Sequence, residues 1–181
     1  MKISLASFGA LALICNSLHA GNYQVNKEAS KIVVDSRATP PHTVTSYVRN
    51  YQSDIQIDPE ALAVSNASFS FKLSDLDSEH KKRDKKMHTW IESAKIPEIV
   101  FKLSEVSVVE GQSIGKGTLS MHGISKEIEI PFAVTKEGKN ILLDGNANFS
   151  YEDWGLAIIK LFLFRVRPEL KVKFHLEGTT R

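Results

Sequence analysis

The sequence predicts an all-β protein, an antiparallel barrel of about eight strands with one short α-helix beside it, over about residues 78–93. Three observations predict this fold. Apolar and polar residues alternate with a period of two along much of the chain, turn-forming residues separate these runs, and one segment alone has helical spacing. A sandwich of two sheets stays open as the alternative, since alternation does not separate the two architectures.

The chain begins like a secretory precursor. Lys2 supplies a positive charge, residues 3–14 are mostly apolar, and Ala20 is a small residue suited to cleavage before Gly21. The apolar segment is too short to span a bilayer, which takes about 20 residues. We therefore expect an exported protein with a signal peptide over residues 1–20 and a single domain over residues 21–181.

Composition excludes several classes of function. The chain holds 23 Lys and Arg against 21 Asp and Glu, and this near balance gives no reason to expect nucleic-acid binding. Its one cysteine, Cys15, lies in the predicted signal peptide. The mature protein is therefore expected to have no disulfide, no thiol nucleophile and no thiolate metal site.

The strand predictions rest on the alternating runs. In the clearest run, Phe69 and Phe71 alternate with polar residues on either side. The runs over 30–35, 44–57 and 63–73 are each expected to form one strand, and later runs centre on Phe101, Ile130, Phe149 and Phe174. Turns are predicted at Asp58-Pro59-Glu60, Glu110-Gly111-Gln112, His122-Gly123 and Lys136-Glu137-Gly138-Lys139.

The predicted helix has one apolar face. Met87, Trp90 and Ile91 recur at i, i+3 and i+4, so this face is expected to pack on the barrel, with Ser78 as the N-cap. The same segment carries a basic run, formed by Lys81, Lys82, Arg83, Lys85 and Lys86. We favour a solvated helix face for these cations, and contact with a membrane surface is the alternative.

No residue pattern predicts catalysis. The chain has no G-x-S-x-G nucleophile motif and no phosphate-binding loop, so we expect neither an enzyme nor a cofactor. His80, Asp84 and His88 are spaced i, i+4 and i+8, which converges poorly on a metal ion, and no metal site is expected. A hydrolase or isomerase that uses His42 or His122 at the barrel mouth is the remaining enzymatic hypothesis.

The stretch over residues 156–164 is nearly all apolar, so alternation does not show which side is buried. A fully buried strand is the favoured interpretation. The alternative is an apolar flap at the mouth of the barrel, which contacts lipid and admits a ligand.

Three stretches carry a family resemblance. They resemble motifs of the YceI-like family, also described as polyisoprenoid-binding. The first is Arg83-Asp84-Lys85-Lys86-Met87 followed by Lys95-Ile96-Pro97-Glu98-Ile99-Val100-Phe101. The second is Gly117-Thr118-Leu119-Ser120-Met121-His122-Gly123-Ile124-Ser125-Lys126, and the third is Phe149-Ser150-Tyr151-Glu152-Asp153-Trp154-Gly155-Leu156. The early strands depart from the family pattern at residues 26–30 and 46–48, and Lys86 stands where a histidine is common. These departures bear on the identity of the ligand more than on the fold.

The resemblance implies a lipocalin-like barrel whose tunnel binds an isoprenoid quinone or a polyprenyl chain, without catalytic residues. With the signal peptide, it leads us to expect a periplasmic protein, or a secreted one. On that basis the side chains expected to face the lipid are Phe69, Phe71, Phe101, Leu119, Met121, Ile130, Phe149 and Phe174. Alternation does not distinguish a lined cavity from a filled interior. A filled barrel that binds a protein partner, as a stress-response module, is therefore the alternative function, and the oligomeric state stays open, with a homodimer as one option.

Overall fold

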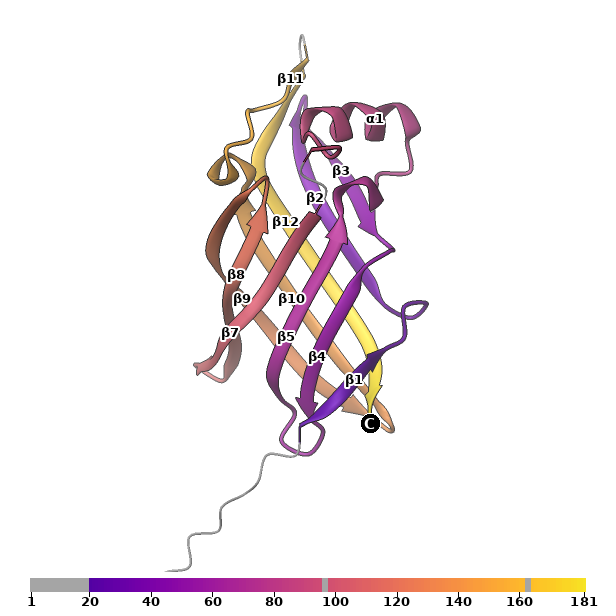
Figure 1. The fold of residues 1–181 in the computed structure, drawn as a ribbon, viewed down its shortest axis with the longest axis vertical. Helices are drawn as coiled ribbons and strands as arrows, with labels where there is room; N and C mark the ends of the chain where they lie inside the picture. Colours follow the sequence, from indigo (N-terminus) through magenta and orange to yellow (C-terminus); the bar gives the residue numbers. More distant parts are fainter. Residues whose placement is uncertain (1–19, 96–97, 162–163) are drawn as a thin grey trace, which may run out of the picture.

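The computed structural model describes residues 20–95, 98–161 and 164–181. A single antiparallel sheet closes into an eight-stranded barrel, which confirms the predicted fold and excludes the sandwich (Figure 1). The ring runs in the order β1 (Gly21–Val25), β4 (Gln52–Asp58), β5 (Ala63–Lys72), β7 (Glu98–Val109), β8 (Gln112–Met121), β9 (Ile124–Glu137), β10 (Asn140–Ser150) and β12 (Phe164–Thr180). It closes because β1 pairs with both β4 and β12.

A hairpin of β2 (Lys31–Thr39) and β3 (His42–Val48) extends the barrel wall. The long strand β12 pairs with β2 along its first part and with β1 at its last residues, and β3 pairs with the two-residue strand β6 (Leu76–Asp77). We call the end of the barrel that carries β6, α1 (Lys81–Trp90) and β11 (Lys160–Leu161) the helix end, and the opposite end, near β1, the closed end (Figure 1).

The single strand predicted over residues 44–57 is wrong. The chain breaks at residues 49–51 and continues as β4, which lies elsewhere in the sheet. Arg49 donates to the carboxylates of Asp77 and Glu79, and Asn50 donates to Asp75. These contacts hold the bend, and a period-two pattern does not reveal them because apolar residues continue on both sides of it.

The predicted turns lie where the strands reverse. Glu110 and Gly111 join β7 to β8 with φ of 51° and 82°, and His122 and Gly123 join β8 to β9 with φ of 51° and 74°. Two successive left-handed residues are typical of the tight type I′ hairpin turn, whose twist matches that of the strands. The residues predicted at 58–60 and 136–139 likewise lie at strand ends.

The helix is shorter than predicted, and Ser78 is not its N-cap. Helix α1 covers Lys81–Trp90, and the His80 side chain accepts a hydrogen bond from the backbone N–H of Arg83. Glu79 has a left-handed φ of 61°, so the helix does not extend back to Ser78. Ser78 instead accepts a hydrogen bond from the Arg83 side chain and donates to the Asp84 carboxylate, which anchors the first turn.

The stretch over residues 156–164 is not a buried strand. Residues 156–159 are irregular, and β11 contributes only two residues that pair with β12. Leu156 is buried, Ala157 is exposed, and Ile158 and Ile159 are half-buried. Residues 162–163 lie outside the described residues, and movement of the segment as a flap stays a prediction.

Candidate functional site

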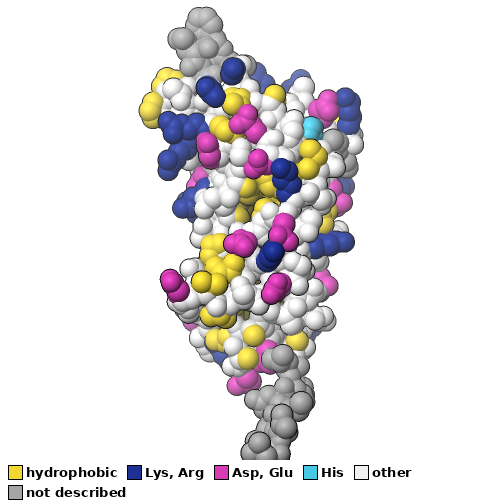
Figure 2. Space-filling model, turned by 90° about the vertical axis from the view of Figure 1, so that its left-hand side faces the viewer, with side chains coloured by type: hydrophobic (Ala, Val, Ile, Leu, Met, Phe, Trp, Pro, Cys, Tyr) yellow, Lys and Arg dark blue, Asp and Glu magenta, His cyan; other side chains and the backbone are white. Residues whose placement is uncertain are grey.

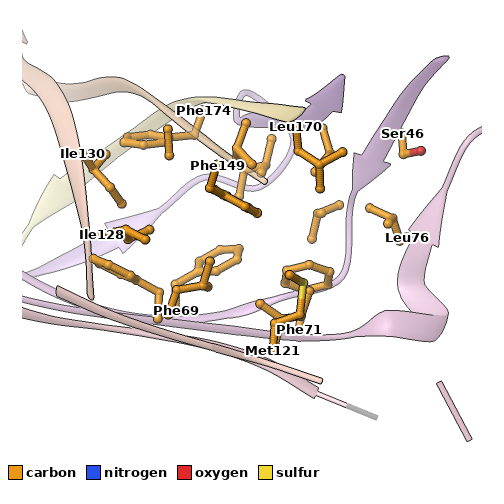
Figure 3. A pocket seen from close by; sticks show the side chains of 18 of the residues that line it. Ser46, Phe69, Phe71, Leu76, Met121, Ile128, Ile130, Phe149, Leu170 and Phe174 are labelled. Atoms are coloured by element: carbon orange, nitrogen blue, oxygen red, sulfur yellow. The ribbon is translucent and has the colours of Figure 1, made fainter. Parts of the chain in front are cut away.

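The barrel encloses a cavity of about 270 Å³ along its axis. It extends from side chains such as Ile130 and Phe174 at one end to Ser46 and Leu76 at the other (Figure 3). Among the described residues that line it, none carries a charge, and the hydroxyl groups come from three serines and Tyr151. An apolar cavity of roughly 150 Å³ already accommodates a benzene-sized guest, so this interior is not filled by its own side chains.

All eight residues predicted to face the ligand line this cavity. They come from six strands that surround it: Phe69 and Phe71 of β5, Phe101 of β7, Leu119 and Met121 of β8, Ile130 of β9, Phe149 of β10, and Phe174, which lies in β12. Their contact with a lipid stays a prediction.

Sequence reasoning missed the lining residues at the helix end. Met87, Trp90 and Ile91 were expected to pack on the barrel, and the structure places them against the cavity itself. Leu156 and Ile159, from the irregular segment before β11, complete this part of the lining. The helical spacing of the first three was visible in the sequence, whereas nothing in the alternation pattern shows that the later segment folds over the same cavity.

Two inward-facing glycines keep bulky aromatic rings against the barrel wall. Gly145 lies opposite Phe174 in the register of β10 and β12, and a Cβ at Gly145 would overlap the Phe174 ring. A Cβ at Gly117 would lie 2.6 Å from the ring of Phe101. Glycine inside a strand often marks such a close approach. The rings thus occupy the space of missing side chains, which leaves the lumen open.

The helix end of the cavity is covered by side chains and irregular backbone. Met87, Trp90 and Ile159 line the cavity at this end and are only half-buried. The Trp90 indole N–H donates to the Ala157 carbonyl at 2.9 Å, and its ring meets Tyr151 edge-on at 5.1 Å. A hydrogen bond and a ring contact therefore join α1 to the segment that precedes β11.

At the closed end, fully buried side chains fill the barrel beyond the cavity. Ile57 and Ile141 are 0% and 1% exposed, and neither lines the cavity. The Tyr23 hydroxyl lies 2.8 Å from the carbonyl oxygen of Ile141 and 2.9 Å from that of Leu176. Burial raises the pKa of the Tyr23 phenol far above its ordinary value, so this hydroxyl keeps its proton.

The histidines do not form a polar site at the cavity. His122 Nδ1 lies 3.0 Å from the carbonyl oxygen of Trp154 and His42 Nδ1 lies 3.1 Å from that of Pro40, and neither residue lines the cavity. Across the described ranges, no cluster of three or more His, Cys, Asp or Glu residues is placed to hold a metal ion.

Comparison with known proteins identifies relatives of this fold. Residues 23–178 match the YceI-like domain family. A UPF0312 protein of Vibrio cholerae is 24% identical, with both chains covered completely. A UPF0312 protein of Photorhabdus laumondii is also 24% identical, over 87% of this chain and 83% of its own length.

Two solved structures share the architecture. BcnA of Burkholderia cenocepacia superimposes with a TM-score of 0.76 at 18% identity, covering 86% of this chain and all of BcnA. A polyisoprenoid-binding domain of Saccharophagus degradans, implicated in plant cell wall breakdown, superimposes with a TM-score of 0.66 at 14% identity, covering 90% of this chain and all of that domain. At these identities the likeness shows a shared barrel fold.

Proposed function

Because this chain belongs to the YceI-like family, we propose that it is an exported, non-catalytic protein that holds a long isoprenoid-type lipid inside its barrel. The ligand class is an isoprenoid quinone or a polyprenyl chain. The observation that carries the proposal is the continuous, uncharged cavity that runs along the barrel axis. The Saccharophagus degradans relative, named for polyisoprenoid binding, supports the same ligand class.

The physical basis of such binding is transfer of hydrocarbon out of water. Each buried methylene contributes about 0.8 kcal/mol, so a long chain gains affinity by threading an apolar tube. The lining offers few groups that could recognise a polar ligand, because its three serines, Ser36, Ser46 and Ser68, are scattered among apolar side chains. A flexible unsaturated chain suits this lining better than a sugar, peptide or nucleotide.

The sequence of the first twenty residues supports export, and we propose that the mature protein works in the periplasm. A lipid carrier in that compartment would take up and release its ligand at a membrane surface. The helix end is suited to this exchange, since Trp90 and Ile159 line the cavity there and are only half-buried.

A series of prenols with increasing numbers of isoprene units tests the proposal. We expect Kd, measured by tryptophan fluorescence titration, to fall at least about tenfold with each added unit until the cavity is full. Poly(ethylene glycol) chains of matched length are the polar control and are expected not to bind. A Kd that does not change with prenol length, or no prenol binding at all, would contradict the proposed function.

A further inference from the structure

Helix α1 turns two different faces toward the barrel and toward solvent. Successive helical residues are about 100° apart, so Lys82, Lys85 and Lys86 lie on the side opposite Met87 and Ile91. Met87 and Ile91 line the cavity, whereas the three lysines are exposed. Figure 1 shows α1 lying across the helix end. Because Met87 and Ile91 face the cavity, the three lysines on the opposite side of α1 face away from the barrel.

No carboxylate of the described residues is paired with these lysines. In the described part of the chain, no carboxylate oxygen lies within 4.0 Å of the ammonium groups of Lys82, Lys85 or Lys86. Carboxylates do occur at this end, but Asp77 and Glu79 are paired with Arg49. Glu92 is likewise paired with Lys95. The outer face of α1 therefore keeps its positive charge.

A second group of cations lies on the hairpin of β11 and β12. Lys160 and Arg165 are direct cross-strand partners, and both are exposed. Arg167 is also exposed, and Val166 between the two arginines lines the cavity, so the arginines face outward. The sequence has no Asp or Glu over residues 154–168. Like charges directly opposite each other destabilise a hairpin, and an external anionic surface would relieve that repulsion.

Both cationic groups lie at the helix end, where α1 and the segment before β11 line the cavity. The hydrogen bond from Trp90 to the Ala157 carbonyl joins α1 to the segment that leads into β11. Ile158 and Ile159, in that segment, add half-buried apolar surface between the two groups. Figure 2 shows Lys and Arg side chains beside hydrophobic ones close to the upper tip of the molecule.

We propose that the helix end docks, opening first, on an anionic phospholipid bilayer. The lysines of α1 and the cations Lys160, Arg165 and Arg167 would contact lipid phosphates, and the apolar segment between them would enter the headgroup region. The inference rests on the proposed function in one respect: docking in this orientation lets a lipid pass between bilayer and cavity without crossing water.

The combination of charges and apolar side chains selects a bilayer as the partner. Each Lys or Arg near an anionic membrane contributes about 1 kcal/mol, and exposed apolar residues add insertion into the interface. The net charge of the whole chain is only +2, so the attraction comes from where the cations lie. The attraction is expected to weaken with salt, because exposed charges are screened within about 10 Å at 0.1 M ionic strength.

Vesicle flotation with two triple variants tests this orientation. The test variant is Lys82→Gln/Lys85→Gln/Lys86→Gln, and the control is Lys102→Gln/Lys139→Gln/Lys171→Gln, which removes three exposed lysines elsewhere on the barrel. In 0.1 M salt the wild type is expected to bind phosphatidylglycerol-containing vesicles and not pure phosphatidylcholine vesicles. The test variant should bind at least about tenfold more weakly, and the control should bind like the wild type.

Two results would overturn the docking proposal: equal binding of the wild type to both kinds of vesicle, or equal loss in the two triple variants. Undecaprenol loading from detergent, measured on the same proteins, separates this proposal from the proposed function. A test variant that loads normally but does not float supports docking through α1. A wild type that floats but loads neither undecaprenol nor an isoprenoid quinone would support docking while refuting the lipid-holding function.

Discussion

The two ends of the barrel are formed by different kinds of secondary structure. At the closed end, strands meet around Tyr23, Ile57 and Ile141, which are almost completely buried. At the helix end, the sheet gives way to a short helix and an irregular segment, and Met87, Trp90 and Ile159 remain half-buried. Fully buried side chains beyond the cavity at one end, and half-buried lining residues at the other, favour the helix end as the place of ligand exchange.

The largest difference between the ends is expected in stability. Ile57→Ala removes a fully buried side chain from the closed end and should lower the free energy of unfolding by about 2–5 kcal/mol. Met87→Ala at the helix end should lower it by less than about 1.5 kcal/mol, since this side chain is half-buried beside a cavity. Urea denaturation measures both. Equal losses would show that the helix end is as tightly packed as the closed end.

Filling the cavity should abolish ligand binding without unfolding the barrel. Ala147 lines the cavity, and Ala147→Phe places a ring in the lumen. We expect prenol affinity to fall at least about tenfold while the free energy of unfolding changes by less than about 1 kcal/mol, because added side-chain volume in a cavity is tolerated. Ala133→Phe, on the exposed side of β9, is the matched control. Normal prenol binding by Ala147→Phe would place the ligand elsewhere.

Loosening the cover of the opening should accelerate ligand release. Trp90→Phe keeps an aromatic ring but removes the hydrogen bond to Ala157, worth about 0.5–1.5 kcal/mol. We expect prenol dissociation to become about fivefold faster, as measured by transfer to acceptor vesicles. Trp154→Phe makes the same chemical change at a buried indole, which donates to the Leu119 carbonyl. The Trp154→Phe control should lose stability without releasing prenol faster. Faster release from both variants would show that the Trp90 hydrogen bond does not itself retain the ligand.

The smallest effect is a fall in stability at alkaline pH. Burial raises the pKa of Tyr23, Tyr51 and Tyr151 above the ordinary value of about 10. The stability that these raised pKa values contribute is complete below pH ~10 and is lost as the pH rises, because the phenols of the unfolded chain lose their protons at a lower pH than those of the folded chain. Unfolding free energies at pH about 9 and about 11 measure it, and Tyr23→Phe should flatten the slope. An unchanged slope in that variant would show that Tyr23 makes no contribution.

Much of the barrel could be predicted from the sequence because its causes are local. Alternation places Phe69 and Phe101 on the inner face, and Gly111 and Gly123 terminate strands through their left-handed backbone. The bend after Val48 escaped prediction because side-chain hydrogen bonds from Arg49 to residues far along the chain hold it. A one-dimensional pattern carries no information about such partners.

The candidate site shows the same division. Its wall follows from period-two alternation, so all eight predicted residues line the cavity. The open interior of the cavity does not follow from alternation, because it depends on which residues face each other across neighbouring strands. Gly145 makes room for Phe174 only because the register brings the two residues face to face. The cover at the helix end depends on a hydrogen bond between Trp90 and Ala157, which are 67 residues apart in the chain.

Native mass spectrometry of the mature protein, purified from the cell envelope in which it is made and followed by organic extraction, tests the central claim most directly. We predict a stoichiometric adduct that extracts as an isoprenoid quinone or a polyprenyl lipid, and that is missing from the Ala147→Phe variant. A protein that carries the mass of its polypeptide alone, and keeps that mass after incubation with quinones and polyprenols, would contradict the account.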